Sequence, residues 1–395
     1  MSKNNAHQAG RHFLQIPGPS NVPDRVLRAI AQPTIDHRGP EFAQLTLRIL
    51  DKLKSVFNTE SPILIYPASG TGGWESSLLN TLCPGDTVLA FETGHFATLW
   101  KNVAVKLGLE VIWVEGDWRQ GIDADVVQQH LIDDQSHQIK AVLAVHTETS
   151  SGATSDIAKI RKAIDAANHP ALYMVDAVSS LACTELRHDD WGIDVTISAS
   201  QKGLMLPPGL CFNAVSEKAL AASKGSTFPH SYWSWDSMLE LNKKGYFPYT
   251  PSTNILYGLD EALCMLHDEG LANVFDRHSR LARATQLAVA GWGLENLCVN
   301  PEECSNSTTA VLMPEGHDAD ALRNVILDRF NMSLGMGLGK VKSTVFRIGH
   351  IGDFNELMLA GTLSGVEMGL NIAGVPHNKD GVNAALEFLA SSAKT

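Results

Sequence analysis

The first part of the chain alternates short apolar runs with stretches whose apolar residues recur at helical spacing. Between residues 60 and 215 the runs are apolar throughout and rich in Val and Ile, which is typical of parallel strands covered on both faces. We predict strands at Ile63–Tyr66, Thr87–Phe91, Glu110–Glu115, Lys140–His146, Ala171–Asp176, Val195–Ala199 and Leu210–Ala214. We predict intervening helices at Trp74–Leu82, Ala97–Leu107, Ala124–Leu131 and Asp156–Ala167. The pattern indicates a doubly wound α/β domain.

The last third of the chain has a mixed pattern. A long helical pattern runs from Leu256 to about Leu287, with a break near Gly270. Shorter patterns follow, strand-like at Thr309–Met313 and Val345–Ile348, and helical at Asp318–Phe330, Glu356–Leu370 and Val382–Ala390. We therefore expect an N-terminal arm over residues 1–22, a large domain over 23–265 and a smaller α+β domain over 266–395.

Composition and charge narrow the class of protein. The 395 residues are 44% hydrophobic and 19% charged, which suits a globular enzyme. The net charge of −12 and the lack of a basic stripe argue against nucleic acid as a partner. No apolar run approaches the ~18 residues of a membrane span, and the polar N-terminus lacks the apolar core of a signal peptide. The six cysteines form no C-x-x-C pair, so we expect reduced thiols in a cytoplasmic protein.

Candidate chemistry follows several of the predicted strands. In open parallel sheets, ligands bind beyond the carboxyl ends of the strands. There the chain carries a Gly-rich turn, Pro67–Gly73, that feeds a helix and can bind phosphate with Thr71 as an added donor. Asp176 ends one strand and Lys202 follows another. Pyridoxal phosphate needs an amine, an acid partner for its ring nitrogen and a phosphate anchor, and these residues supply all three.

The glycine turn on its own has other interpretations. Gly70 and Gly72 also fit the start of a dinucleotide fingerprint, and Glu92 lies at the distance where such a site binds ribose. The third glycine of that fingerprint is replaced by Glu75. An ordinary strand–helix junction is equally compatible with the turn taken alone.

Over nearly its whole length, the sequence resembles the class V, fold-type-I aminotransferases of the serine–glyoxylate and alanine–glyoxylate type. The motifs that carry this resemblance are Ile16–Pro23, Ser69–Glu75, Val175–Ser180, Ser200–Gly203, Pro248–Pro251, Phe346–His350 and Gly374–Pro376. The resemblance implies a mostly parallel seven-stranded sheet in the large domain, pyridoxal 5'-phosphate as cofactor, and a homodimer with shared active sites. No metal is implied.

The resemblance also implies roles for the residues that match the family motifs. Lys202 would be the catalytic Schiff-base lysine and Asp176 the catalytic partner of the pyridinium nitrogen. Thr250 would reach the phosphate of the other subunit. The full set implied for cofactor binding is Thr71, Gly72, Gly73, Phe96, Thr149, Asp176, Val178, Gln201, Lys202 and Thr250, and the set for substrate binding is Gly18, Thr149 and Arg347.

Two points about this set stay open. Phe96 would stack on the cofactor, although the adjacent His95 could do so instead. Arg347 would take the substrate carboxylate as a bidentate pair, to which its planar fork is suited, although it could instead form a structural salt bridge, a role that a lone arginine inside Val345–Ile348 fits less well.

The implied reaction is ping-pong transfer of an amino group from a small amino acid to glyoxylate, giving glycine. Serine, which would give hydroxypyruvate, is favoured as the donor because no second arginine stands in a comparably convincing motif; Arg38 is the nearest candidate. Aspartate and alanine remain alternatives. Thr147 departs from the asparagine that the serine–glyoxylate sequences favour, and Ser231–Trp235 and Gly352–Asn355 resemble relatives that use aspartate.

Three other functions remain possible from the sequence. A cysteine desulfurase or lyase of the same fold would use Cys298 or Cys304, which lie about where such enzymes carry their nucleophile. A nicotinamide-dependent oxidoreductase would use the glycine turn. A non-catalytic binding protein is disfavoured because the chain keeps both Lys202 and Asp176.

Overall fold

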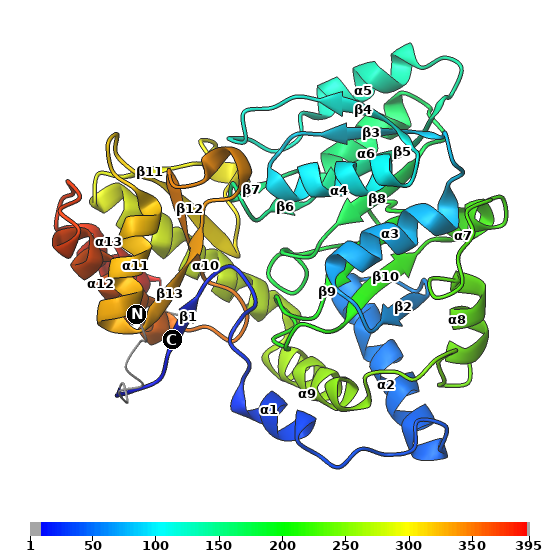
Figure 1. Cartoon of the computed structure of the whole chain (residues 1–395), viewed down its shortest axis with the longest axis horizontal. Helices are drawn as coiled ribbons and strands as arrows, with labels where there is room; N and C mark the ends of the chain where they lie inside the picture. The colour runs from blue at the N-terminus through cyan, green and yellow to red at the C-terminus, as the bar shows by residue number, and fades with distance from the viewer. Residues whose placement is uncertain (1–8, 393–395) are drawn as a thin grey trace, which may run out of the picture.

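A seven-stranded sheet forms the centre of the larger part of the molecule (Figure 1). The computed structural model describes residues 9–392. The strand order is β2-β10-β9-β8-β5-β3-β4, with bounds β2 Ile63–Tyr66, β3 Thr87–Phe91, β4 Glu110–Val114, β5 Ile139–Val145, β8 Leu172–Asp176, β9 Val195–Ala199 and β10 Cys211–Val215. Each predicted strand is present within one residue of its expected bounds. The prediction of a mostly parallel seven-stranded sheet is therefore confirmed.

One strand of this sheet runs against the others. β10 is antiparallel to both of its neighbours, β9 and β2. The connection from β9 to β10 contains no helix, and without a crossover helix the next strand returns in the opposite direction. The remaining neighbours pair in parallel, so the carboxyl ends of β3, β5, β8 and β9 meet at one edge.

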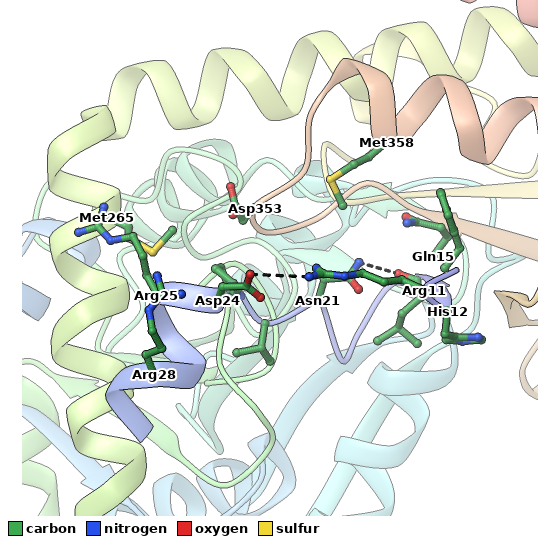
Figure 2. A pocket seen from close by; sticks show the side chains of 14 residues that line it. Arg11, His12, Gln15, Asn21, Asp24, Arg25, Arg28, Met265, Asp353 and Met358 are labelled. Carbon is green, nitrogen blue, oxygen red and sulfur yellow. Dashed lines mark hydrogen bonds and ion pairs between the residues drawn. The ribbon is translucent and has the colours of Figure 1, made fainter. Parts of the chain in front are cut away.

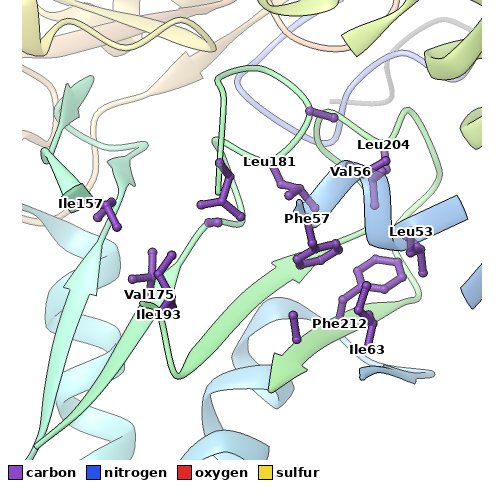
Figure 3. Packing of buried hydrophobic residues seen from close by; sticks show 14 of the residues in the cluster. Leu53, Val56, Phe57, Ile63, Ile157, Val175, Leu181, Ile193, Leu204 and Phe212 are labelled. Carbon is purple, nitrogen blue, oxygen red and sulfur yellow. The ribbon is translucent and has the colours of Figure 1, made fainter. Parts of the chain in front are cut away.

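Helices cover both faces of the sheet because its strands are apolar on both sides. In β2, Ile63 and Ile65 pack into one core layer while Leu64 and Tyr66 pack into the other. In the first layer, Phe57 lies 6.4 Å from Phe212 of β10, measured between ring centroids (Figure 3). That layer is formed with α1 Asp24–Ile30, α2 Pro40–Phe57, α5 Ala124–Asp133, α6 Ile157–Ala166 and α9 Thr253–Glu269. The other is formed with α3 Gly70–Thr81, α4 His95–Lys106, α7 Glu217–Ser223 and α8 Trp235–Asn242.

A second sheet, with order β1-β13-β14-β12-β11, organises the smaller part of the molecule. Its strands are β1 Phe13–Gln15, β11 Glu295–Asn296, β12 Thr308–Leu312, β13 Met332–Met336 and β14 Val345–Gly349. Its helices are α10 Leu271–Gly291, α11 Ala319–Phe330, α12 Glu356–Ile372 and α13 Gly381–Ser391. The remaining elements are β6 Thr147–Glu148, β7 Ala153–Thr154 and 3-10 turns at Pro301–Glu303 and Gly339–Val341. The helix break expected near Gly270 separates α9 from α10, and Gly270 has a φ of 82°.

The N-terminal segment connects the two parts. β1 joins the second sheet by pairing in parallel with β13. The chain then passes the carboxyl end of β9, where the Ser20 amide donates to the Gln201 carbonyl (2.9 Å). The domain boundaries drawn from the sequence stay a prediction. No helix within residues 9–392 is long and apolar enough to cross a membrane.

Candidate active site

A cavity of about 240 Å³ lies at the edge where the parallel strands end. It collects residues that follow β2, β5, β8 and β9, together with part of the N-terminal segment and the start of α4. The predicted site residues that line it are Gly18, Thr71, Phe96, Thr149, Asp176, Val178, Gln201 and Lys202. Its other lining residues are Pro19, Ser69, Gly70, Trp74, Thr147, Ser179 and Pro208. Gly72, Gly73, Thr250 and Arg347 lie outside this lining.

The glycine turn forms the first turn of α3, which begins directly after Ser69. The amides of Gly72 and Gly73 donate to the Ser69 carbonyl, at 2.9 and 3.3 Å. A Cβ on Gly73 would lie 2.8 Å from Ile197 of β9, and one on Gly72 would lie 2.7 Å from Trp233. These two glycines therefore let the helix pack closely against its neighbours, while the positive end of α3 and Thr71 face the cavity.

Asp176 is buried at the end of β8, where two N–H groups hold its carboxylate. The Val178 amide donates to Oδ1 (2.7 Å) and the Trp74 indole donates to Oδ2 (3.1 Å). Burial raises the pKa of Asp176 to about 7, against the lowering effect of these donors and of the Lys202 charge. A positively charged ring nitrogen would favour the ionised carboxylate.

Lys202 lies directly beyond β9 and is also buried. Burial, with the nearby charge of Arg347, lowers the pKa of Lys202 to about 8. Its Nζ donates to the Pro17 carbonyl. The next residue, Gly18, has a φ of 114°, and a Cβ there would overlap the end of the Lys202 side chain. The N-terminal segment therefore closes over the amine, and only glycine fits at position 18.

Glu148 fixes the start of α4 and with it the position of Phe96. Its Oε2 accepts from the amides of Phe96 and Ala97, both at 3.0 Å, and its Oε1 accepts from the Ser150 amide (3.0 Å) and hydroxyl (2.7 Å). The carboxylate thus caps the helix N-terminus, where negative charge is favoured. Phe96 lines the cavity in a position to pack against a bound ring, whereas His95 does not line it.

The other predicted residues have different surroundings. The Thr149 hydroxyl, expected to bind the cofactor's ring oxygen, is hydrogen-bonded to the Ser179 hydroxyl. Arg347 is buried in β14 and donates to the Met336 carbonyl through Nε (2.8 Å) and to the Thr149 carbonyl through Nη1 (2.9 Å). Burial lowers the pKa of Arg347 to about 10. Thr250 is exposed and is not among the residues that line the cavity.

The residues present fit pyridoxal phosphate. Gln201 lines the cavity, and its Oε1 is buried without a hydrogen-bond partner among residues 9–392, so the amide can turn to present its Nε2 donor to a phosphate. The helix end, the amine and the buried carboxylate match the three groups of the cofactor. Thr71, Gln201 and the first turn of α3 would hold the phosphate, Asp176 the ring nitrogen and Lys202 the aldehyde carbon.

The alternative functions lose support in the structure. Glu92, the candidate ribose ligand, accepts from the Trp118 indole (3.2 Å) and pairs with Lys340 (2.5 Å). Cys298 and Cys304 do not line the cavity that contains Lys202; both sulfur atoms lie 3.5 Å from the Asn300 carbonyl oxygen.

A larger cavity of about 580 Å³ lies elsewhere, between β1, α1, α9 and the start of α12 (Figure 2). Arg11 crosses it towards Asp24, at 3.8 Å, and both side chains are largely exposed. It contains no predicted site residue, so size alone does not identify the chemical site.

Sequence reasoning assigned no role to Trp74 or to Glu148. Trp74 belongs to the Ser69–Glu75 motif. An apolar residue at the start of a predicted helix is usually a core residue, so the motif alone does not indicate a role for its indole N–H. The link from Trp74 to Asp176 spans 102 residues. No local sequence pattern predicts a hydrogen bond between residues so far apart.

Comparisons with known proteins agree with this geometry. The family model described as Aminotransferase class-V matches residues 12–338. A serine–glyoxylate aminotransferase from Methylorubrum extorquens is 47% identical, with 96% of each chain covered. An L-aspartate–glyoxylate aminotransferase from Paracoccus denitrificans is 41% identical, with 94% of each covered. The solved structure of pyridoxamine–pyruvate aminotransferase from Mesorhizobium loti superposes with a TM-score of 0.92 at 27% identity, covering 98% of this chain and all of that one.

Fold and site together define a pyridoxal-phosphate-dependent transaminase of fold type I. The chain belongs to the class-V aminotransferase family. The predictions of fold class, family and cofactor are therefore confirmed.

Proposed function

We propose that the protein transfers the amino group of L-serine to glyoxylate, producing hydroxypyruvate and glycine. The observation that carries this proposal is the similarity to serine–glyoxylate aminotransferase over almost the whole of both chains. The cavity is compatible with a donor that carries one carboxylate, because Arg347 lies beside it on the Thr149 carbonyl and no arginine is among the described residues that line it. A donor with a second carboxylate would need a further cation or several N–H donors.

Pyridoxal phosphate supplies the aldehyde that accepts the amino group and the ring that withdraws electrons from the reacting carbon. Lys202 is proposed to remove the α-proton of the donor and to deliver a proton to C4′ of the cofactor. A lysine pKa near 8 suits this work, since a general base is most effective when its pKa lies near the working pH. Asp176 would keep the ring nitrogen protonated.

Substrate orientation is proposed to depend on Arg347. Two of its five N–H groups are used by the Met336 and Thr149 carbonyls, and three remain to hold the α-carboxylate that both substrates present. Gly18 would let the substrate and the amine approach each other without a side chain between them.

Two-substrate kinetics test the proposal. Serine, alanine and aspartate are compared as donors with glyoxylate and pyruvate as acceptors, with the purified holoenzyme. The expected result is the highest kcat/KM for serine with glyoxylate. A tenfold or greater preference for aspartate contradicts the proposed donor, and Arg38 is then the first residue to replace.

We also propose a homodimer in which Thr250 of one subunit reaches the phosphate of the other. Thr250 is exposed, and the adjacent Tyr249 stacks on the half-exposed Tyr232 at 4.3 Å between ring centroids. Thr250→Ala is expected to weaken cofactor retention in dialysis without altering the absorbance of the bound cofactor. A fully active monomer in sedimentation analysis contradicts the proposal.

A cytoplasmic location is proposed as well. It is supported by the six free cysteines, whose thiols stay reduced in that compartment. Cell fractionation with compartment markers tests it.

A further inference from the structure

We propose that Trp74 is a positioning residue, whose indole N–H holds the Asp176 carboxylate ionised and oriented towards the ring nitrogen of the cofactor. The inference rests on the proposed transaminase function and goes beyond it by assigning the group that prepares Asp176. It starts from one contact, 3.1 Å between Trp74 Nε1 and Asp176 Oδ2.

The carboxylate has one N–H donor from the chain on each oxygen. The Val178 amide binds Oδ1 and the Trp74 indole binds Oδ2. An ionised carboxylate has about four acceptor positions, so room remains for a ring N–H. Both chain donors favour the charged form, because a neutral carboxylic acid accepts hydrogen bonds more weakly.

These donors matter because the surroundings of Asp176 otherwise oppose ionisation of its carboxyl group. It is buried, and the negative charge of Glu148 faces it from β6. Lys202 is the cation that faces it, but a lysine that acts as a base is neutral for part of each cycle. The indole is a neutral donor that titrates at no physiological pH, so its contribution persists whichever form Lys202 takes.

Packing keeps the indole on its target. Trp74 stacks on Trp100 of α4, with ring centroids 5.9 Å apart and planes inclined by 13°. Both side chains are buried between α3 and α4. A ring held this way cannot swing from Asp176 without disturbing the core.

The chain offers a matched control for the test. Trp100 belongs to the same stacked pair, yet its Nε1 is buried without a hydrogen-bond partner among residues 9–392. Trp74→Phe and Trp100→Phe therefore remove similar packing, but only Trp74→Phe removes a donor to Asp176.

The measurement is the ionisation of Asp176 in the enzyme stripped of cofactor, followed by NMR of protein labelled with carbon-13 at the aspartate carboxyls. Asp176→Asn assigns the signal. Trp74→Phe is expected to raise the titration midpoint by about one pH unit, a tenfold change in the ionisation constant. Trp100→Phe keeps an aromatic ring against Trp74 and is expected to leave the midpoint unchanged.

Affinity for pyridoxal phosphate gives a second readout. At a pH below the shifted midpoint, Trp74→Phe is expected to bind the cofactor several-fold more weakly than Trp100→Phe, and the difference is expected to shrink as the pH rises. Equal midpoints in the two variants overturn the inference, whatever happens to their activity.

A tryptophan analogue with sulfur in place of the indole N–H, incorporated at position 74, covers the case in which Trp74→Phe does not fold. It preserves the ring shape, and the same rise in midpoint is expected. An unchanged midpoint overturns the inference. These readouts use no amino acid substrate, so failure of the proposed serine–glyoxylate reaction would be recognised separately, in the kinetics of the unaltered enzyme.

Discussion

Replacing Arg347 by lysine tests the proposed substrate contact most directly. Lys keeps the positive charge but loses the planar fork that can hold both oxygens of a carboxylate. In the structure Nε and one N–H of Nη1 are occupied by the Met336 and Thr149 carbonyls. The remaining N–H groups of Nη1 and Nη2 form the pair that would face the substrate.

The size of the effect follows from these bonds. A hydrogen bond to a charged group contributes about 1.5–3 kcal/mol. Losing one of the two hydrogen bonds from residue 347 to the substrate carboxylate therefore costs about 2 kcal/mol, or roughly 30-fold in kcat/KM. Because serine and glyoxylate each present an α-carboxylate, both values of kcat/KM should fall by a similar factor.

Arg323→Lys provides the control. Arg323 also donates through Nε to a carbonyl of β13, that of Leu334 (2.8 Å), and through Nη1 to a carboxylate, Asp320 (2.7 Å), away from the cavity lining. Steady-state kinetics with each substrate varied, together with thermal melting, separate a lost structural bond from a lost substrate bond. The reasoning is refuted if Arg347→Lys reduces kcat/KM for one substrate only, or no more than Arg323→Lys does.

Three further predictions follow from the site. Asp176→Asn is expected to retain cofactor but to lose about 10²-fold or more in kcat, since an unprotonated ring is a poorer electron sink; near-normal turnover would show that Asp176 is structural. Gly18→Ala is expected to slow cofactor capture and catalysis strongly, because its φ of 114° strains a residue with a Cβ and that Cβ would push the end of the Lys202 side chain from its place; unchanged stopped-flow capture would contradict the closure over the amine. The capture rate of stripped enzyme should rise with pH through a midpoint near 8, since only neutral Lys202 attacks an aldehyde and its pKa is lowered to about 8; a midpoint near 10 would show that the amine is not desolvated.

The strands were predictable because their signal is local. Continuous apolar runs such as Val195–Ala199 are buried on both faces of the sheet. Burial on both faces favours apolar residues at successive positions, so five consecutive residues are enough to show the pattern. The chemistry at their carboxyl ends was predictable for the same reason, since Asp176 and Lys202 directly follow such runs. The reversed direction of β10 depends on its partners and was not foreseen.

The elements before the sheet were not among those predicted, although one of them has a local signal. α2 has a clear apolar face, with Phe42, Leu45, Ile49 and Leu53 buried, and this helical spacing is a local signal that predicts a helix before the strand-rich region. β1 is three residues long and acquires its place only by pairing with β13, more than 300 residues later. Contacts of that kind leave no periodic pattern in the segment itself.

Burial explains why the two central groups of the site work together. The same dry cavity raises the pKa of Asp176 to about 7 and lowers that of Lys202 to about 8, because desolvation disfavours the charged form of each. For Lys202 the shift is useful, since it provides a neutral base. For Asp176 it is harmful, since only the ionised form can hold a protonated ring. The N–H donors of Val178 and Trp74 act on Asp176 alone and limit the rise of its pKa, so that above about pH 8 the lysine is neutral while the aspartate is charged.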